Sequence, residues 1–221
     1  MARHQARAGL IVCLLLTQAS CVGRQHTSSS SGVPGEFDYY VLAFSWAPSF
    51  CAHEGENRKS GECAAGRETG FIVHGLWPER NAGQRLENCA PVPPVRTEIV
   101  DQMLPLMSDS GLIQHEWRTH GSCTGLSVDD YFRTVRRAAE RIGVPAFYRA
   151  LHHAVETSPV EIERRFAGFN HLRGLSALRV LCRQGELREV RVCLTRGLDP
   201  HPCAWNMRDC RAAQIFVRPI P

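Results

Sequence analysis

Hydrophobic and polar positions alternate with a period of about two near both ends of the chain. The aromatic and branched stretch at 37–46 predicts a strand, and 69–78 predicts a second one that Gly75 and Pro78 end. Three more strands are predicted near the C-terminus, at 175–182, 187–194 and 214–218. The first two of these should form a hairpin around Gln184-Gly185.

In the middle of the chain the apolar positions recur every three to four residues, which predicts helices. The expected helices are 95–104, ended or kinked by Pro105; one starting near Asp109; 128–142, capped by Ser127; 145–154; and 159–167, capped by Ser158. Strands at both ends of a helical middle predict a single α+β domain, in which a mainly antiparallel sheet packs against several helices.

One predicted helix carries an unusual concentration of reactive side chains. Glu116 and His120 are four residues apart and share a helical face, while His115 lies about 100° round from Glu116. Gly121 fits the left-handed position that closes a helix. The pattern therefore predicts a short helix that presents two imidazoles and a carboxylate to one region, which is the outline of a proton-transfer site.

Two other interpretations of this stretch stay open on spacing alone. It could be a plain polar helix face. It could also hold a metal, although helical zinc sites use histidines four residues apart and His115 and His120 are five apart. Cys123 stands three residues after His120, but no second pair with that spacing would complete four ligands. A metal site is the least favoured of the three.

The N-terminus has the features of an export signal. Arg3 and Arg7 precede an apolar run at 8–16, so residues 1–20 are predicted to be a signal peptide, and no other segment approaches the length of a membrane span. Residues 21–36 are rich in Ser and Gly and are predicted to be a disordered leader before a domain at 37–221. Cys21 could carry a lipid anchor, with a soluble exported form preferred.

Composition narrows the classes of function. The formal net charge is +4, and two of those charges, Arg3 and Arg7, leave with the signal, so the domain is close to neutral and has no broad footprint for polyanions. Lys59 is the only lysine, and arginine favours local bidentate contacts to phosphate.

Eight cysteines remain after Cys13 and Cys21 are set aside, and an even number in an exported chain predicts four disulfides. Cys51 and Cys63 are expected to close the loop at 51–66. There is no Cys-x-x-Cys, which argues further against zinc.

Two separated segments, Phe-Ile-Val-His-Gly-Leu-Trp-Pro at 71–78 and His-Glu-Trp-Arg-Thr-His-Gly-Ser-Cys at 115–123, together resemble the active-site segments of the ribonuclease T2 family. The opening strand and the cysteine-rich end resemble the same family, so the likeness covers about residues 37–218. These proteins are extracellular, vacuolar or periplasmic acid endoribonucleases. The resemblance implies a disulfide-rich ribonuclease T2-like fold and an exported, periplasmic or extracellular protein.

The resemblance also implies roles for four residues. His120 would be the general base on the ribose 2′-hydroxyl and His74 the general acid on the leaving 5′-oxygen. His115 would help to hold the phosphate, and Glu116 would support the site and the transition state. Cleavage of RNA by its own 2′-hydroxyl needs one neutral and one protonated group, which two histidines supply at mildly acidic pH without a metal or another cofactor.

The expected substrate is single-stranded RNA, cut through a 2′,3′-cyclic phosphate to 3′-phosphate ends by a monomeric enzyme. DNA lacks the 2′-hydroxyl and should not be cleaved. By resemblance, Trp77 stacks on a base and Glu79 assists in the same pocket.

The chain departs from the family at one position. A lysine that steadies negative charge usually precedes the second catalytic histidine, and here Thr119 stands there, with Arg118 one residue earlier. On a helix this moves the cation about 100°. We therefore expect an active enzyme with lowered turnover.

The resemblance implies the pairs Cys89–Cys123, Cys193–Cys203 and Cys182–Cys210, beside Cys51–Cys63. Two rival functions remain. One is a catalytically impaired RNA- or protein-binding module, motivated by Thr119, and the other is a metalloprotein using His115, His120 and Cys123. Trp46, Trp117 and Trp205 are expected in the core, and the arginines of the helix 128–142 on a solvated face.

Overall fold

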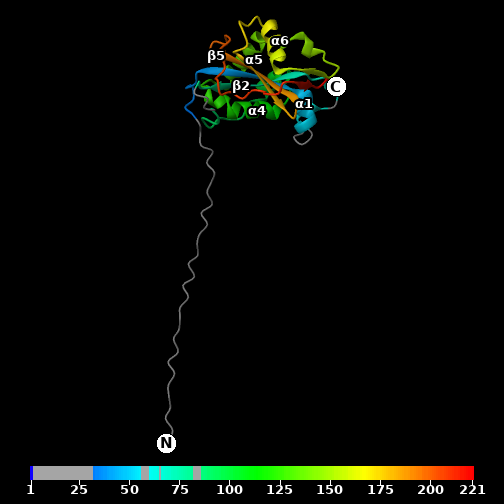
Figure 1. Ribbon diagram of the computed structural model, residues 1–221. Coiled ribbons are helices and arrows are strands. Elements are labelled where there is room, and N and C mark those ends of the chain that lie inside the picture. Colours follow the sequence, from blue (N-terminus) through cyan, green and yellow to red (C-terminus); the bar gives the residue numbers. More distant parts are fainter. Residues whose placement is uncertain (2–31, 56–59, 65, 82–85) are drawn as a thin grey trace.

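The computed structural model describes residues 1, 32–55, 60–64, 66–81 and 86–221 (Figure 1). The predicted signal peptide, Cys21 and most of the predicted leader therefore lie outside the described residues. Within the described part of the chain, no helix has the length and the apolar composition needed to span a membrane.

The sheet has the strand order β2-β1-β5-β6-β3, and β4 pairs with β5 outside this path. The strands are β1 (Tyr39–Trp46), β2 (Phe71–Glu79), β3 (Val155–Thr157), β4 (Leu178–Arg183), β5 (Glu186–Thr195) and β6 (Ile215–Val217). All pairs are antiparallel except β5 with β6. The α+β class and the antiparallel sheet are confirmed.

The longer helices are α3 (Thr97–Met107), α4 (Ser110–Thr119), α5 (Val128–Arg141) and α6 (Pro159–Phe169). Their apolar faces join the main core over one face of the sheet, together with side chains such as Leu42, Phe44 and Leu76. Figure 1 shows α5 and α6 on one side of the strands and α4 alongside β2. The opposite face of β1 and β5 is covered by other residues.

That opposite face carries a second, smaller cluster around Tyr39, Val41, Ala43 and the cystine of Cys193. Strand β1 is therefore buried on both faces, which is why its sequence reads as a nearly continuous apolar run.

The predicted helix start near Asp109 and the predicted caps at Ser127 and Ser158 are confirmed. Asp109 accepts a hydrogen bond from the Leu112 N–H at 2.8 Å at the start of α4. Ser127 and Ser158 cap α5 and α6 in the same way. The hairpin turn is confirmed too, because Gln184 and Gly185 both have positive φ, as a type I′ turn requires.

Of the two effects expected of Pro105, it does not end its helix, since α3 continues to Met107 and stops where Ser108 takes a left-handed φ of 63°. Three other expectations about local structure were wrong. The segment 145–154 forms only a short 3₁₀ helix, Ala146–Arg149, before the unexpected strand β3. A helical segment, α1 (Ala47–Phe50) continuing as η1 (Cys51–Gly55), occupies part of the expected loop.

Gly121 is not left-handed either. It begins a 3₁₀ turn, η3 (Gly121–Cys123), after His120 with φ −111°. Glycine is needed there for space, because a Cβ would lie 2.3 Å from the Trp117 ring.

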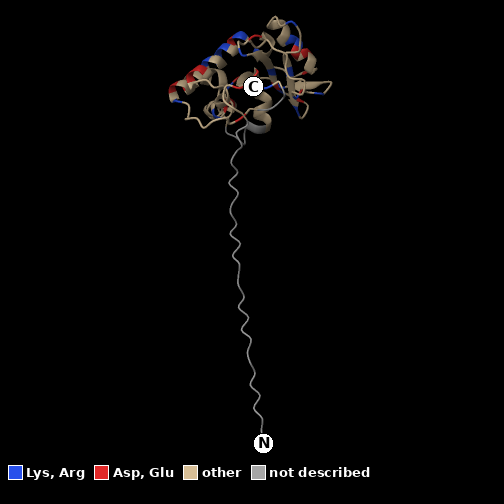
Figure 2. Ribbon diagram, turned by 90° about the vertical axis from the view of Figure 1, so that its left-hand side faces the viewer, with Lys and Arg blue, Asp and Glu red and all other residues tan. Residues whose placement is uncertain are grey.

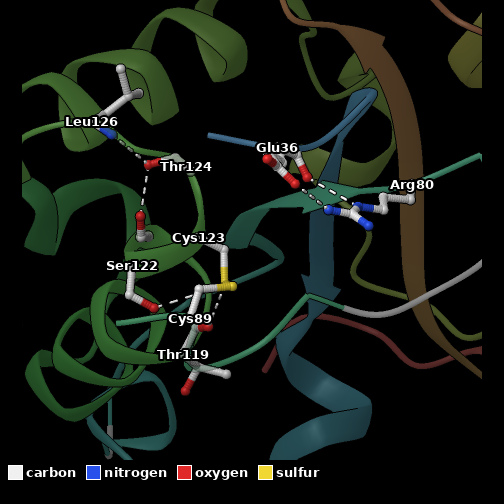
Figure 3. Close-up of a disulfide and its surroundings, with 9 residues drawn as sticks. Glu36, Arg80, Cys89, Thr119, Ser122, Cys123, Thr124 and Leu126 are labelled. Carbon is white, nitrogen blue, oxygen red and sulfur yellow. Dashed lines mark hydrogen bonds and ion pairs between the residues drawn. A yellow bond between two sulfur atoms is a disulfide. The ribbon is translucent and has the colours of Figure 1, made fainter. Parts of the chain in front are cut away.

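All four expected disulfides are present: Cys51–Cys63, Cys89–Cys123, Cys182–Cys210 and Cys193–Cys203. The ordered domain starts before residue 37, which corrects the predicted leader. The Gly35 N–H donates to the Cys123 carbonyl at 2.9 Å, and Glu36 pairs with Arg80 at 3.1 Å (Figure 3). Trp46 and Trp117 are buried as expected, but Trp205 is 89% exposed, so its placement in the core was wrong.

Candidate active site

The structure brings the two predicted histidines together around one tryptophan. His74 comes from β2, and His120 ends α4. The ring of Trp77 lies 5.2 Å from the His74 ring and 5.3 Å from the His120 ring, centroid to centroid. This approach of β2 to α4 requires Gly75, because a Cβ there would lie 2.0 Å from Glu116 Oε2.

Glu116 is fully buried at the centre of this cluster. Its Oε2 accepts a hydrogen bond from Trp77 Nε1 at 2.7 Å, and its Oε1 lies 3.6 Å from His74 Nε2. Burial raises the pKa of Glu116 to about 7, although His74 and the Trp77 N–H both oppose this rise. At acidic pH the carboxyl group is therefore largely protonated and able to donate.

A second carboxylate holds the other side of His74. Glu189 Oε1 lies 2.7 Å from His74 Nδ1, and Arg191 Nε donates to Glu189 Oε2 at 2.6 Å. Burial alone would lower the pKa of His74, but the hydrogen bond and charge of Glu189, with the charge of Glu116, raise it above its ordinary value. Burial opposes ionisation of Glu189, yet its contacts with His74 and Arg191 bring its pKa down to about 2.

Glu189 and Arg191 were not identified from the sequence as site residues. The available signal was their position two residues apart in a predicted strand, which places both on one face. A glutamate in an apolar strand also calls for a buried partner.

The remaining helix residues lie at the edge of the site. His115 is exposed, and its ring lies 6.5 Å from the ring of His120. Thr119 is buried, with its Oγ1 3.4 Å from His115 Nδ1, while Arg118 is exposed. The structure thus brings His74, Glu116 and His120 into one cluster and leaves His115 on its solvent side.

Trp77, the residue expected to stack on a base, is largely buried. The indole is only 6% exposed, its N–H is donated to Glu116, and the Arg191 guanidinium lies 4.7 Å from the ring centroid. Trp77 also forms one wall of a cavity of about 300 Å³. We call this the side cavity, and it is lined by Tyr39, Trp77, Glu79, Leu181, Arg191, Ala204, Asn206, Met207 and Arg208.

The end of α4 is tied down covalently. Cys123 follows His120 by three residues and bonds to Cys89, whose neighbour Asn88 donates its N–H to the Thr119 carbonyl at 2.7 Å. Figure 3 shows this disulfide beside Thr119, with Thr124 reaching back to the turn that follows His120. The metalloprotein hypothesis needed the Cys123 sulfur as a metal ligand, and in the structure this sulfur is bonded to Cys89.

Charge is mixed around the fold. In Figure 2, basic and acidic positions are interspersed along the helical ribbons. On α5, Arg133 pairs with Asp130 and Arg141 with Asp199, as expected of a solvated face.

The comparisons with known proteins agree on one protein family. The model of the ribonuclease T2 family matches residues 37–203. A ribonuclease of Aeromonas hydrophila is 31% identical over 194 residues, covering 81% of this chain and 82% of that protein. Ribonuclease DdI of Dictyostelium discoideum is 28% identical, covering 86% and 87%.

Two solved structures share the fold. An RNase-related protein from Calystegia sepium gives a TM-score of 0.62 at 18% identity, covering 84% of this chain and 98% of that one. A mutant of RNase MC1 in complex with 5′-UMP gives 0.63 at 20% identity, covering 81% and 98%.

Proposed function

Since the chain belongs to the ribonuclease T2 family and is an endoribonuclease of that type, we propose that it cleaves single-stranded RNA by transesterification without a metal. The observation that carries this proposal is the pairing of two imidazoles, His74 and His120, around buried Glu116, with His74 held between two carboxylates. We expect the enzyme to act outside the cytoplasm, because four disulfides suit an oxidising compartment.

The roles follow from the charge on His74. Glu189, whose pKa of about 2 keeps it charged, favours the protonated form of His74, so His74 is the general acid and His120 the general base. His120 takes the proton of the 2′-hydroxyl, and the 2′-oxygen attacks phosphorus. The bond from phosphorus to the 5′-oxygen breaks as His74 protonates that oxygen, which leaves a 2′,3′-cyclic phosphate. Water then opens the ring to a 3′-phosphate with the roles reversed.

The other residues complete the site. Glu116, with a pKa of about 7, carries a proton at acidic pH that it can donate to a phosphoryl oxygen. His115 is exposed beside His120 and contacts the phosphate from the solvent side. The side cavity receives one base, with Trp77 as a wall and Glu79 as a hydrogen-bonding group.

The test is a cleavage assay of the oxidised protein on RNA and DNA of one sequence, at about pH 5 to 7 and with EDTA. We expect cleavage of RNA alone, unaffected by EDTA, with cyclic-phosphate and 3′-phosphate ends found by mass spectrometry. A folded protein that binds RNA but leaves it intact would contradict the proposal and favour the binding-module alternative. Loss of activity in EDTA would contradict the metal-free mechanism.

Thr119 gives a second prediction. A lysine at this position would add a cation where the family usually has one, and such a charge-stabilising donor is worth up to about a hundredfold in rate. We expect Thr119→Lys to raise kcat on RNA. Thr119→Met is the matched control, since it fills the same space without charge. Equal rates for the two variants would show that this position does not limit turnover.

A further inference from the structure

Trp205 differs from the other three tryptophans of the chain. Trp46, Trp77 and Trp117 are at most 6% exposed, whereas the Trp205 side chain is 89% exposed. An indole is among the largest apolar surfaces a residue can offer, and folding buries almost none of this one.

The segment that carries Trp205 is fixed at both ends. Cys203 bonds to Cys193 on β5, and Cys210 bonds to Cys182 on β4. The backbone N–H of Cys203 donates to Ser176 O at 2.9 Å, and that of Cys210 donates to Val180 O at 2.7 Å. The tryptophan is therefore displayed from a loop of defined position, so that placing a ligand against it orders little extra chain.

The same segment forms one side of the side cavity. Ala204 and Asn206, on either side of Trp205 in the chain, both line that cavity, as do Met207 and Arg208. Trp77 lines the same cavity, and its ring contacts those of His74 and His120. The side cavity is thus bordered by Trp77, which lies next to the histidine pair, and by the chain neighbours of Trp205.

The charge next to Trp205 suits a phosphate backbone. Arg208 and Arg211 are exposed three and six residues further on, with Asp209 as the one acidic side chain in that run. Exposed aromatic rings next to arginines are the pattern by which proteins hold single-stranded nucleic acid without reading its sequence.

We propose that Trp205 is a stacking platform for a nucleobase of the RNA, one nucleotide beyond the base held in the side cavity. The inference rests on the proposed function, because the RNA must pass the histidine pair. It predicts that the enzyme gains affinity from a chain longer than a dinucleotide, and that this gain depends little on base identity.

The test compares a dinucleotide with a hexanucleotide as substrate. For wild type we expect the larger kcat/KM on the hexanucleotide. Trp205→Ala should lower kcat/KM on the hexanucleotide about tenfold, as expected for the loss of one stacked base. It should leave kcat/KM on the dinucleotide unchanged. Trp205→Phe should keep most of the gain. Phe216→Ala is the matched control, since Phe216 is an aromatic residue 51% exposed on β6, and it should change neither value.

Binding of a labelled hexadeoxynucleotide, which offers bases but no 2′-hydroxyl, separates this inference from the proposed function. If the wild-type protein cleaved no RNA, and Trp205→Ala bound the oligonucleotide about tenfold more weakly than wild type, the proposed function would be contradicted and the stacking platform supported. Unchanged binding, or equal losses of kcat/KM on both substrates, would overturn the platform.

Discussion

His120→Ala should lower kcat on RNA by about a thousandfold or more, because without a base the 2′-hydroxyl must lose its proton to water. His74→Ala should cause a loss of similar size on the same substrate, for the opposite reason: the leaving 5′-oxygen then departs without a proton. Melting temperatures would show that both variants fold. Loss in one variant alone would contradict the two-histidine mechanism.

An activated substrate distinguishes the two roles. In uridine 3′-(4-nitrophenyl phosphate) the leaving group is stable as an anion and needs no acid. We expect His74→Ala to regain most of its activity on this substrate, while His120→Ala stays impaired. The reverse pattern would show that the roles are exchanged, and the charge on His74 would then need another explanation. His152→Ala, at an exposed histidine outside the cluster, is the control.

Glu189→Gln is the second large effect we expect. It removes the charge that holds His74 in its protonated form, and the Gln amide cannot satisfy both His74 Nδ1–H and Arg191 Nε–H as an acceptor. Partners that orient a functional histidine typically contribute about tenfold to a hundredfold. We expect kcat to fall by this amount.

The pH profile tests whether Glu189 acts through His74. The ion pair contributes its complete stabilisation above the ordinary Glu pKa of 4.5 and below the ordinary His pKa of 6.5. Its stabilisation is lost as pH falls towards about 2, where Glu189 protonates, and as pH rises through the pKa of His74, where the imidazole loses its charge. In Glu189→Gln, the pKa of His74 should drop, so the alkaline limb of the kcat profile should move to lower pH.

The chain offers a matched control on the same strand. Glu186 bonds His53 at 3.1 Å and Arg218 at 2.6 Å, which repeats the carboxylate, histidine and arginine arrangement away from the site. Glu186→Gln should leave the pH profile unchanged. If both variants shift the profile alike, or if Glu189→Gln loses activity with no shift, Glu189 is structural rather than a positioning residue. NMR titration of the His74 ring would give the same answer directly.

Local signals predicted much of this fold. Three helix starts were readable because Asp109, Ser127 and Ser158 each bond a backbone N–H within their own turn. The prediction that Gly121 takes a left-handed φ was wrong. Glycine is required there because the Trp117 ring leaves no room for a Cβ, and such packing cannot be read from local sequence.

The residues of the site likewise divide into those that local sequence segments predicted and those that depend on packing. His74, Glu116 and His120 lie in two recognisable segments. Glu189 reaches His74 from β5, which is separated from β2 by β1 in the sheet. The contact passes over Ala43 and Ser45 of β1, which pair with Arg191 and Glu189 in register. Such a register between strands far apart in sequence is not readable from the residues alone.

The Cys89–Cys123 disulfide has a consequence for when the enzyme becomes complete. Three residues separate His120 from a covalent bond that forms only where thiols are oxidised. A newly made chain in a reducing compartment, among the messenger and ribosomal RNA of the cell, lacks this tie at the end of α4. If the chain is exported as proposed, the oxidation that forms the tie takes place away from the RNA that the cell must keep.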